Sequence, residues 1–137
     1  MDPYQNFKIK EYVYWSTYLH ENQSYLGRCY VWCKRKDAFD LPDATPDEQI
    51  EVFEILRELE GNLIDIFGAD MLNYAFLGNI THHLHGHIIP RYSKPIEFDN
   101  VTFVDDRWGK NYLTNPDFKI SEVLVQKIKQ TIIERLK

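Results

Sequence analysis

The chain has 137 residues, of which 44% are hydrophobic and 15% aromatic, a composition typical of a folded globular protein rather than a disordered one. Its formal net charge of −5 argues against a broad nucleic-acid-binding surface. No apolar run approaches the ~20 residues that a membrane-spanning helix requires. We therefore expect a single domain over residues 1–137, with no nucleic-acid partner and no membrane partner.

The two strands expected first lie close together in the sequence. Residues 11–20 are rich in tyrosine and tryptophan, which favours a β-strand. A polar turn at residues 21–24 separates them from a second predicted strand over residues 26–33. The short connection predicts that these two strands pair antiparallel. The charged residues 34–37 then lead into a loop.

The two cysteines of the second predicted strand indicate the redox state of the protein and its cellular location. Cys29 and Cys33 are too few for a disulfide framework, and on one strand they lie too far apart to bridge each other. The N-terminus is polar and does not resemble a signal peptide. Both observations predict a reduced protein with a cytoplasmic location.

A long helix is predicted next. Thr45 is a suitable N-cap, Pro46 suits the first helical position, and Glu48 completes a capping box. Gly68 is expected to end the helix in a left-handed conformation. The predicted buried side is an apolar stripe at three- to four-residue spacing, made of Ile50, Phe53, Leu56, Leu59, Leu63 and Ile66. We interpret the charged opposite side as solvated surface.

The second half of the chain is predicted to mix short strands with one more helix. Residues 71–77 read as a strand that ends at Gly78-Asn79 and forms a hairpin with the histidine-rich stretch after it. Residues 96–98 and 101–104 are short strand candidates about a turn at 99–100, and residues 108–112 form a loop. Ser121 caps a final helix that extends to Leu136.

Four of the five histidines fall between Thr81 and Arg91, and three of them, His83, His85 and His87, alternate strictly. On a strand, alternate side chains point to one face, so neighbouring imidazoles would lie about 6.6 Å apart at ~3.3 Å rise per residue. The β-branched residues that follow favour a strand, which Pro90 is expected to end. The sequence therefore predicts a row of three imidazoles on one face of a sheet.

Two kinds of chemistry fit such a row. A transition-metal site is one, but His83 and His87 would lie on the order of 13 Å apart. Zinc–nitrogen bonds of about 2.0–2.1 Å cannot gather all three rings without bending the strand. Phosphate chemistry is the other, because a neutral imidazole is a nucleophile near pH 7 and its neighbours supply charge and hydrogen bonds to a transferring phosphoryl group.

The run His83-Leu84-His85-Gly86-His87-Ile88-Ile89, followed by Pro90-Arg91, resembles the signature His-φ-His-φ-His-φ-φ of the histidine triad (HIT) superfamily, where φ is hydrophobic. The order of the predicted elements is also similar to that of the family. The resemblance implies an α+β fold, with an antiparallel sheet of about five strands, one long central helix and a C-terminal helix. It also implies a homodimer.

The same resemblance implies a nucleotide hydrolase or transferase. Its substrate would be a purine nucleotide derivative, either a dinucleoside polyphosphate or a nucleoside phosphoramidate, attacked at the α-phosphate through a covalent nucleotidyl-histidine. His85 corresponds to the nucleophile, His87 to a contact with the phosphate and leaving group, and His83 to a support of the cluster. No cofactor is implied for the histidine chemistry, although a divalent metal ion can accompany a polyphosphate substrate.

Further positions are expected to bind the nucleotide. By resemblance, Asn73 lies near the ribose or phosphate and Asn79 near the phosphate, although Asn73 also suits the end of a hydrogen-bond ladder and Asn79 a turn. Leu26 and Gly27 are assigned to the nucleotide site. The base is expected between the first strands and the long helix, with walls from Tyr25, Leu26 and Phe53.

The chain also departs from the family pattern. Gly86 replaces a hydrophobic residue and leaves a gap for another backbone or an aromatic ring to fill. Lys36 lies where the family often has a further histidine, and Lys110 lies in a loop that either covers the site or is a solvated turn. His87, where the uridylyltransferase branch has glutamine, favours a hydrolase.

Two alternative functions are a nucleotide-binding or signalling protein without turnover and, less favoured, a metal-binding protein.

Overall fold

A five-stranded antiparallel sheet forms the centre of the computed structural model, which describes residues 3–136. The strand order is β1-β2-β3-β5-β4, and the strands are β1 (Lys8–Glu11), β2 (Trp15–Leu19), β3 (Cys29–Cys33), β4 (Met71–Ala75) and β5 (His85–Arg91). A separate hairpin joins β6 (Ile96–Phe98) to β7 (Val101–Phe103). The α-helices are α1 (Pro46–Phe67) and α2 (Glu122–Arg135), and two short 3₁₀ helices cover Gln5–Phe7 and Leu41–Asp43. The α+β fold predicted from the sequence is confirmed.

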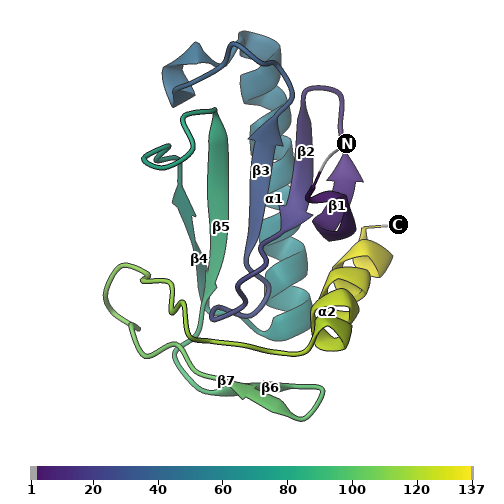
Figure 1. The fold of residues 1–137 in the computed structure, drawn as a ribbon, viewed down its shortest axis with the longest axis vertical. Coiled ribbons are helices and arrows are strands. Elements are labelled where there is room, and N and C mark those ends of the chain that lie inside the picture. The colour runs from purple at the N-terminus through teal and green to yellow at the C-terminus, as the bar shows by residue number, and fades with distance from the viewer. Residues whose placement is uncertain (1–2, 137) are drawn as a thin grey trace.

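The helices leave one face of the sheet open. Helix α1 runs behind the sheet, α2 lies beside β1 and the lower end of α1, and the β6–β7 hairpin lies below the sheet (Figure 1). None of the helices in residues 3–136 is long and apolar enough to span a membrane. The front face in Figure 1 carries neither of the two α-helices, so a site on it depends on the strands, the loops at their ends and the N-terminal segment.

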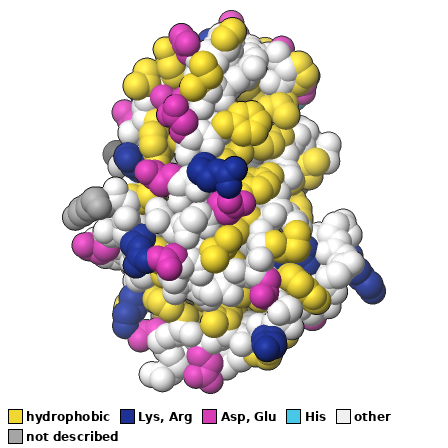
Figure 2. All heavy atoms as spheres, turned by 180° about the vertical axis from the view of Figure 1, so that it is seen from behind, with side chains coloured by type: hydrophobic (Ala, Val, Ile, Leu, Met, Phe, Trp, Pro, Cys, Tyr) yellow, Lys and Arg dark blue, Asp and Glu magenta, His cyan; other side chains and the backbone are white. Residues whose placement is uncertain are grey.

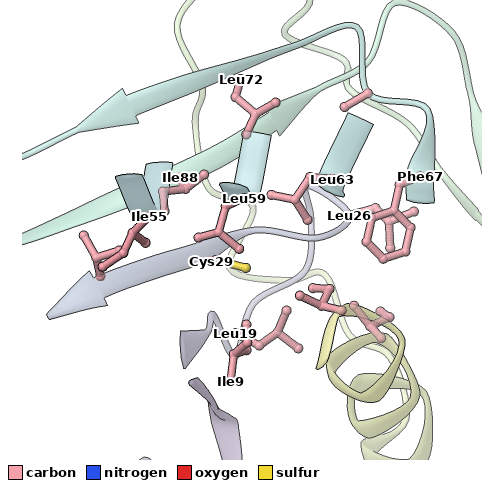
Figure 3. Packing of buried hydrophobic residues seen from close by; sticks show 14 of the residues in the cluster. Ile9, Leu19, Leu26, Cys29, Ile55, Leu59, Leu63, Phe67, Leu72 and Ile88 are labelled. Atoms are coloured by element: carbon pink, nitrogen blue, oxygen red, sulfur yellow. The ribbon is translucent and has the colours of Figure 1, made fainter. Parts of the chain in front are cut away.

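The core lies between the sheet and α1. Alternate residues of the paired strands, among them Leu19, Cys29 and Ile88, point toward the helix, where they meet Leu59 and Leu63 (Figure 3). The strand period of two therefore divides each strand into a core side and an open side. This division places the side chains of β5 that are not in the core, His85 and His87, on the open face.

Helix α1 begins and ends where local signals place it. The Thr45 side chain accepts a hydrogen bond from the Glu48 amide, the Glu48 carboxylate accepts one from the Thr45 amide, and Gly68 has φ 74°. The predicted buried stripe is partly wrong, because Ile50 and Phe53 are 61% and 71% exposed. The helix instead buries the overlapping stripe Val52, Ile55, Leu59, Leu63 and Phe67.

Three predicted strand boundaries also need correction. Residues 11–20 contain the end of β1, a tight turn closed by the Tyr12 amide and the Trp15 carbonyl, and then β2. Strand β3 begins only at Cys29, because Gly27 adopts φ 86° in the preceding turn. Strand β5 starts at His85 and continues through Pro90. At Pro90 the partner strand is β4 alone, a position where a strand tolerates proline.

The gap that Gly86 leaves beside β5 is filled by the ring of Phe76, which is the aromatic alternative predicted from the sequence. A Cβ atom at Gly86 would lie 2.3 Å from Cε2 of Phe76, so any side chain here must displace that ring. We expect Gly86→Ala to lower the free energy of unfolding by roughly 1–3 kcal/mol, as overpacking of a core usually does. Urea unfolding measures the loss.

A matched control for Gly86 is Gly61, which lies within α1, where an added Cβ atom would meet nothing within 4 Å. Gly61→Ala is expected to leave stability unchanged or to raise it by up to about 1 kcal/mol, because alanine favours helices. Adding Phe76→Leu to Gly86→Ala should restore part of the loss. An unfolding midpoint of Gly86→Ala equal to that of the wild type would contradict the close packing described here.

Candidate functional site

Two of the three alternating histidines stand side by side on the open face. His85 and His87 belong to β5, opposite Trp32 and Tyr30 of β3, and their ring centroids lie 5.3 Å apart. Among the described residues, no histidine is visible on the face that α1 forms (Figure 2). The alternation read from the sequence therefore brings these two imidazoles together, and the geometry of a strand is the reason.

His83 does not continue the row. It precedes β5, and its ring stacks on Trp32 with centroids 4.2 Å apart. Its Nε2 lies 2.6 Å from the carbonyl oxygen of Cys33, so Nε2 carries the proton and donates it. The predicted row of three equally spaced imidazoles is thus replaced by a pair, with His83 anchored beside it by β3.

The backbone of His83 determines the tautomer of His85. Nδ1 of His85 lies 2.6 Å from the carbonyl oxygen of His83, and a carbonyl can only accept a hydrogen bond. Nδ1 must therefore carry the proton, which leaves the lone pair of a neutral imidazole on Nε2. His85 is consequently held as a nucleophile, with its unprotonated nitrogen at the far end of the ring.

His87 is held in the opposite tautomer. Its Nδ1 lies 3.2 Å from Nη2 of Arg28, and a guanidinium can only donate. Nδ1 must therefore be unprotonated, and the neutral ring carries its proton on Nε2. The pair thus combines a nitrogen lone pair on His85 with an N–H donor on His87, which is a suitable arrangement for holding and attacking a phosphoryl group.

Two functional candidates were missed in the sequence. His20, the remaining histidine, follows β2, and its ring lies 5.7 Å from that of His87. Arg28 precedes β3, and its carbonyl accepts a hydrogen bond from the His20 amide. The pairing register of β2 with β3, which places Leu19 opposite Cys29, would have located both residues near the site. Neither residue forms part of a local motif.

A cavity of about 460 Å³ opens in front of the histidine pair. One wall, which we call the aromatic wall, consists of Tyr18, Tyr30 and Trp32 from β2 and β3. Tyr4 and Phe7 contribute from the N-terminal segment. His20, His85 and His87 line the same cavity. This volume is in the range of sites that bind small molecules, and its apolar lining with a few convergent polar groups is typical of them.

The structure corrects the expected position of the base-binding residues. Leu26 is fully buried in the core, and Gly27 is packed against Phe67, so neither lines the cavity. Tyr25 is buried and Phe53 lies on the outer side of α1. The space between the first strands and α1 is filled by the core. The histidines point to the opposite face, which is why a ligand can reach them only there.

Other predicted residues lie apart from the histidine cavity. The Asn73 side chain accepts a hydrogen bond from Arg91 at 2.7 Å, in a second hollow that it shares with Lys110. Lys36 is exposed in the turn after β3. Asn79 is exposed in the loop between β4 and β5, and its role in phosphate binding stays a prediction. The loop at residues 108–112 reaches the site through Tyr112 rather than through Lys110.

A metal site was the alternative interpretation of the histidines. Within residues 3–136, no three or more His, Cys, Asp or Glu side chains are grouped closely enough to hold a metal ion. One ring nitrogen of each of these histidines bonds to the protein, with Cys33 as the partner of His83, His83 as that of His85 and Arg28 as that of His87.

Two half-buried histidines make stability depend on pH. Burial, followed by the charge of Arg28, lowers the pKa of His87 to about 4 and that of His20 to about 3. In the unfolded chain a histidine has a pKa of about 6.5, so the unfolded state takes up protons that the folded state excludes. The free energy of unfolding should therefore fall as the pH drops from about 6.5 toward 4, and the fall should end below the folded pKa values.

Urea unfolding between about pH 7.5 and 4.5 measures this dependence. His87→Gln should unfold with a shallower pH dependence than the wild type over this range, because one of the two excluded protons is removed. His82→Gln is the matched control, since His82 is exposed. Parallel pH curves for the wild type and His87→Gln would contradict the exclusion of a proton from His87.

The comparisons with known proteins agree with this geometry. The family model described as HIT domain matches residues 17–94. A hypothetical histidine triad nucleotide-binding protein from Sulfolobus tokodaii strain7 has a TM-score of 0.73 and 19% identity, with 95% of this chain and 83% of that chain covered. A histidine triad protein from Bradyrhizobium japonicum has a TM-score of 0.70 and 21% identity, with 95% and 90% covered.

A third similar structure is the diadenosine triphosphate hydrolase of Plasmodium falciparum in complex with cyclomarin A, with a TM-score of 0.69, 14% identity, and 96% of this chain and 77% of that chain covered. No curated protein matches the sequence. At these identities the solved structures show the shared fold. Because the family model covers more than half of the residues, including β3, α1, β4 and the histidine strand, the chain belongs to the HIT domain family.

Proposed function

We propose that the protein is a nucleotide hydrolase or transferase that acts on the α-phosphate of a purine nucleotide derivative through a covalent nucleotidyl-His85. The observation that carries the proposal is the tautomer of His85. Its Nδ1–H is engaged by the His83 carbonyl, and the ring lines a cavity large enough for a nucleoside. A neutral imidazole presented in this way is a nucleophile that needs no further activation.

The cavity supports a nucleotide as the ligand. The aromatic wall offers flat apolar surface on which a purine can stack, and the histidine pair lies at the same cavity, within reach of a phosphate attached to the nucleoside. His87 presents its Nε2–H to the phosphate oxygens, and His83 holds His85 in place. The similar protein from Plasmodium falciparum is a diadenosine triphosphate hydrolase, which supports a dinucleoside polyphosphate as one substrate class.

The reaction consists of two displacements at phosphorus. First, Nε2 of His85 bonds to the α-phosphorus, the bond to the leaving group breaks, and its electron pair departs with the leaving group. Second, a water oxygen bonds to phosphorus, the phosphorus–nitrogen bond breaks, and its electron pair returns to Nε2. The proton that water loses passes to the solvent. Nδ1–H of His85 remains bonded to the His83 carbonyl in both steps.

Intact-protein mass spectrometry after brief mixing tests the proposal. The protein is mixed with diadenosine triphosphate, or separately with an adenosine phosphoramidate, and quenched in mild alkali because N-phosphorylated imidazole is labile to acid. We expect the mass increment of one adenylyl group and release of adenosine monophosphate. Tight binding of adenosine monophosphate with neither an adduct nor turnover would favour the non-catalytic binding protein, and stoichiometric zinc in the purified protein would favour the metal-binding one.

We also propose a homodimer formed through β4. This strand is at the edge of the sheet, so its main chain can pair with β4 of a second copy in an antiparallel, two-fold manner. Beside it, a hollow of about 350 Å³ between α1 and β4 is lined by Phe53, Tyr74 and Phe76 among others. Hydrophobic side chains gather among charged ones on the face that α1 forms (Figure 2).

Sedimentation velocity tests the dimer. Phe53→Glu should convert the wild-type dimer to a monomer, because it places a charge in the apolar contact. Val123→Glu is the matched control, since Val123 is similarly exposed but lies on α2. A wild-type protein that sediments as a monomer at tens of micromolar would contradict the dimer.

We also propose a cytoplasmic location, which the two free cysteines, Cys29 and Cys33, support.

A further inference from the structure

Arg28 is the buried charge nearest to the histidine pair, and the groups around it hold it in place. The residue is 3% exposed. Nη1 donates to the Thr114 hydroxyl at 2.6 Å, Nη2 lies 3.2 Å from Nδ1 of His87, and the Tyr112 ring lies 5.2 Å from the guanidinium carbon. Nε is buried with no hydrogen-bond partner in residues 3–136. No carboxylate is bonded to it in this part of the chain, so the charge is not part of an ion pair.

A donor fixed at Nδ1 prevents His87 from becoming a cation. The cation needs a proton on Nδ1, and that proton would point at the N–H of a guanidinium that Thr114 and Tyr112 keep from turning away. The titratable rings beside His87 are His85 on β5, His20 after β2 and Tyr30 on β3. Glu21 lines the same cavity, but within residues 3–136 no carboxylate is hydrogen-bonded or ion-paired to His87. Burial and Arg28 together lower the pKa of His87 to about 4.

We propose that Arg28 is a positioning residue that keeps His87 a neutral hydrogen-bond donor, and that the site is therefore matched to phosphoric anhydrides rather than to phosphoramidates. The proposal rests on the function proposed above, since it assigns the substrate class of the same site. It separates two substrate classes that the histidine motif does not distinguish.

The leaving group explains the preference. When the bond from the α-phosphorus to a bridging oxygen breaks, the electron pair leaves with a phosphate oxygen. Because the second pKa of a phosphate is about 6, that oxygen departs as an anion at pH 7 without a proton. A departing amine has a conjugate-acid pKa near that of lysine, about 10.4, and must be protonated as the phosphorus–nitrogen bond breaks. A neutral His87 would have to become an imidazolate to supply that proton.

The tautomer of His87 can be read without turnover. Two-bond ¹H–¹⁵N correlation spectra of histidine-labelled protein distinguish a proton on Nδ1 from one on Nε2. For the wild type at about pH 7 and pH 5.5, on either side of the ordinary histidine pKa, we expect a neutral His87 with its proton on Nε2. In Arg28→Met, where only burial and His85 still oppose the charge, His87 should take up its second proton at a higher pH than in the wild type. A wild-type His87 that is cationic at the lower pH, or protonated on Nδ1 at the higher one, would overturn the proposal.

Kinetics test the substrate class. For the wild type, kcat/KM for diadenosine triphosphate should exceed that for an adenosine phosphoramidate by about 10-fold or more. Arg28→Met should lower kcat for the anhydride by about 10- to 100-fold, part of the ~10²–10³ that one oriented hydrogen-bond donor to the transition state contributes, and should reduce the ratio between the two substrates. Thr114→Val keeps the charge of Arg28 but removes the hydroxyl that holds its guanidinium. It should therefore also reduce the ratio of kcat/KM for the anhydride to that for the phosphoramidate, by less than Arg28→Met does.

The control and the outcomes separate the two proposals. Arg135→Met removes an exposed arginine of α2 and should change neither the spectrum nor the ratio. An unchanged ratio and an unchanged His87 tautomer in folded Arg28→Met and Thr114→Val would overturn the role of Arg28 even if the His85 adduct forms. Absence of the adduct with both substrates would overturn the proposed function and, with it, the substrate class.

Discussion

Replacing His85 by alanine is expected to abolish the adenylyl adduct and to lower kcat by roughly 10⁴-fold or more, as removal of a covalent nucleophile does in other enzymes. The physical reason is that the variant lacks the ring whose lone pair the backbone fixes at the cavity, on Nε2. His87 cannot substitute for it, because its Nε2 carries a proton while Arg28 occupies Nδ1. Intact mass and steady-state kinetics measure the two losses.

The neighbouring His82 supplies the control for this variant. His82 lies in the loop before β5, and its exposed ring faces Asp40 and Phe39 of the segment between β3 and α1. It does not line the cavity. His82→Ala should retain the adduct and most of the activity. Binding of adenosine monophosphate should persist in His85→Ala, because the aromatic wall is unchanged. An adduct that still forms on His85→Ala would show that another residue is the nucleophile.

Replacing Arg91 by methionine is expected to cause the largest loss of stability. Arg91 and Asp105 form an ion pair in which Nε and Nη2 each contact a carboxylate oxygen, at 2.7 and 3.1 Å, and the two side chains are 4% and 1% exposed. Removing one partner leaves a buried charge without compensation, which costs about 3–5 kcal/mol. Urea unfolding measures the change in the free energy of unfolding.

The double variant Arg91→Met with Asp105→Leu is the matched test of that reason. If the loss arises from the uncompensated carboxylate, the double variant should be more stable than Arg91→Met alone, because an apolar pair leaves no buried charge. A double variant as unstable as the single one would show that the loss arises elsewhere. The remaining hydrogen bonds of Arg91, to the carbonyls of Arg107 and Lys110, are the first place to look.

Arg91 also connects stability to the site. By bonding the carbonyls of Arg107 and Lys110, it fixes the loop that continues to Tyr112 and Thr114, the two residues that hold Arg28. The second hollow, around Asn73 and Lys110, is lined by Arg91 itself, so it lies beside the loop that supports Arg28 and, through Arg28, the histidine pair. This arrangement explains why Asn73, expected near the nucleotide, bonds to Arg91 instead.

Much of this protein was determined by the sequence through local interactions. The limits of α1 follow from Thr45, Glu48 and Gly68, and the β6–β7 turn and α2 lie where short-range signals predict them. The placement of His85 and His87 on one face of a strand follows from their spacing of two. Each of these features depends on short-range signals, so no knowledge of the rest of the chain is needed.

Only the tertiary structure decided which surfaces face each other. Two overlapping apolar stripes run along α1, and packing against the sheet selects the one with Val52 and Ile55 and leaves Phe53 outside. The same packing buries Leu26 and leaves the cavity of the histidine pair on the opposite face of the sheet. Arg28 reaches His87 across 59 residues of chain, and His20 across still more, because β3 pairs with β5 and with β2. Such contacts depend on strand order and register, which are properties of the assembled sheet and are not encoded in any short segment.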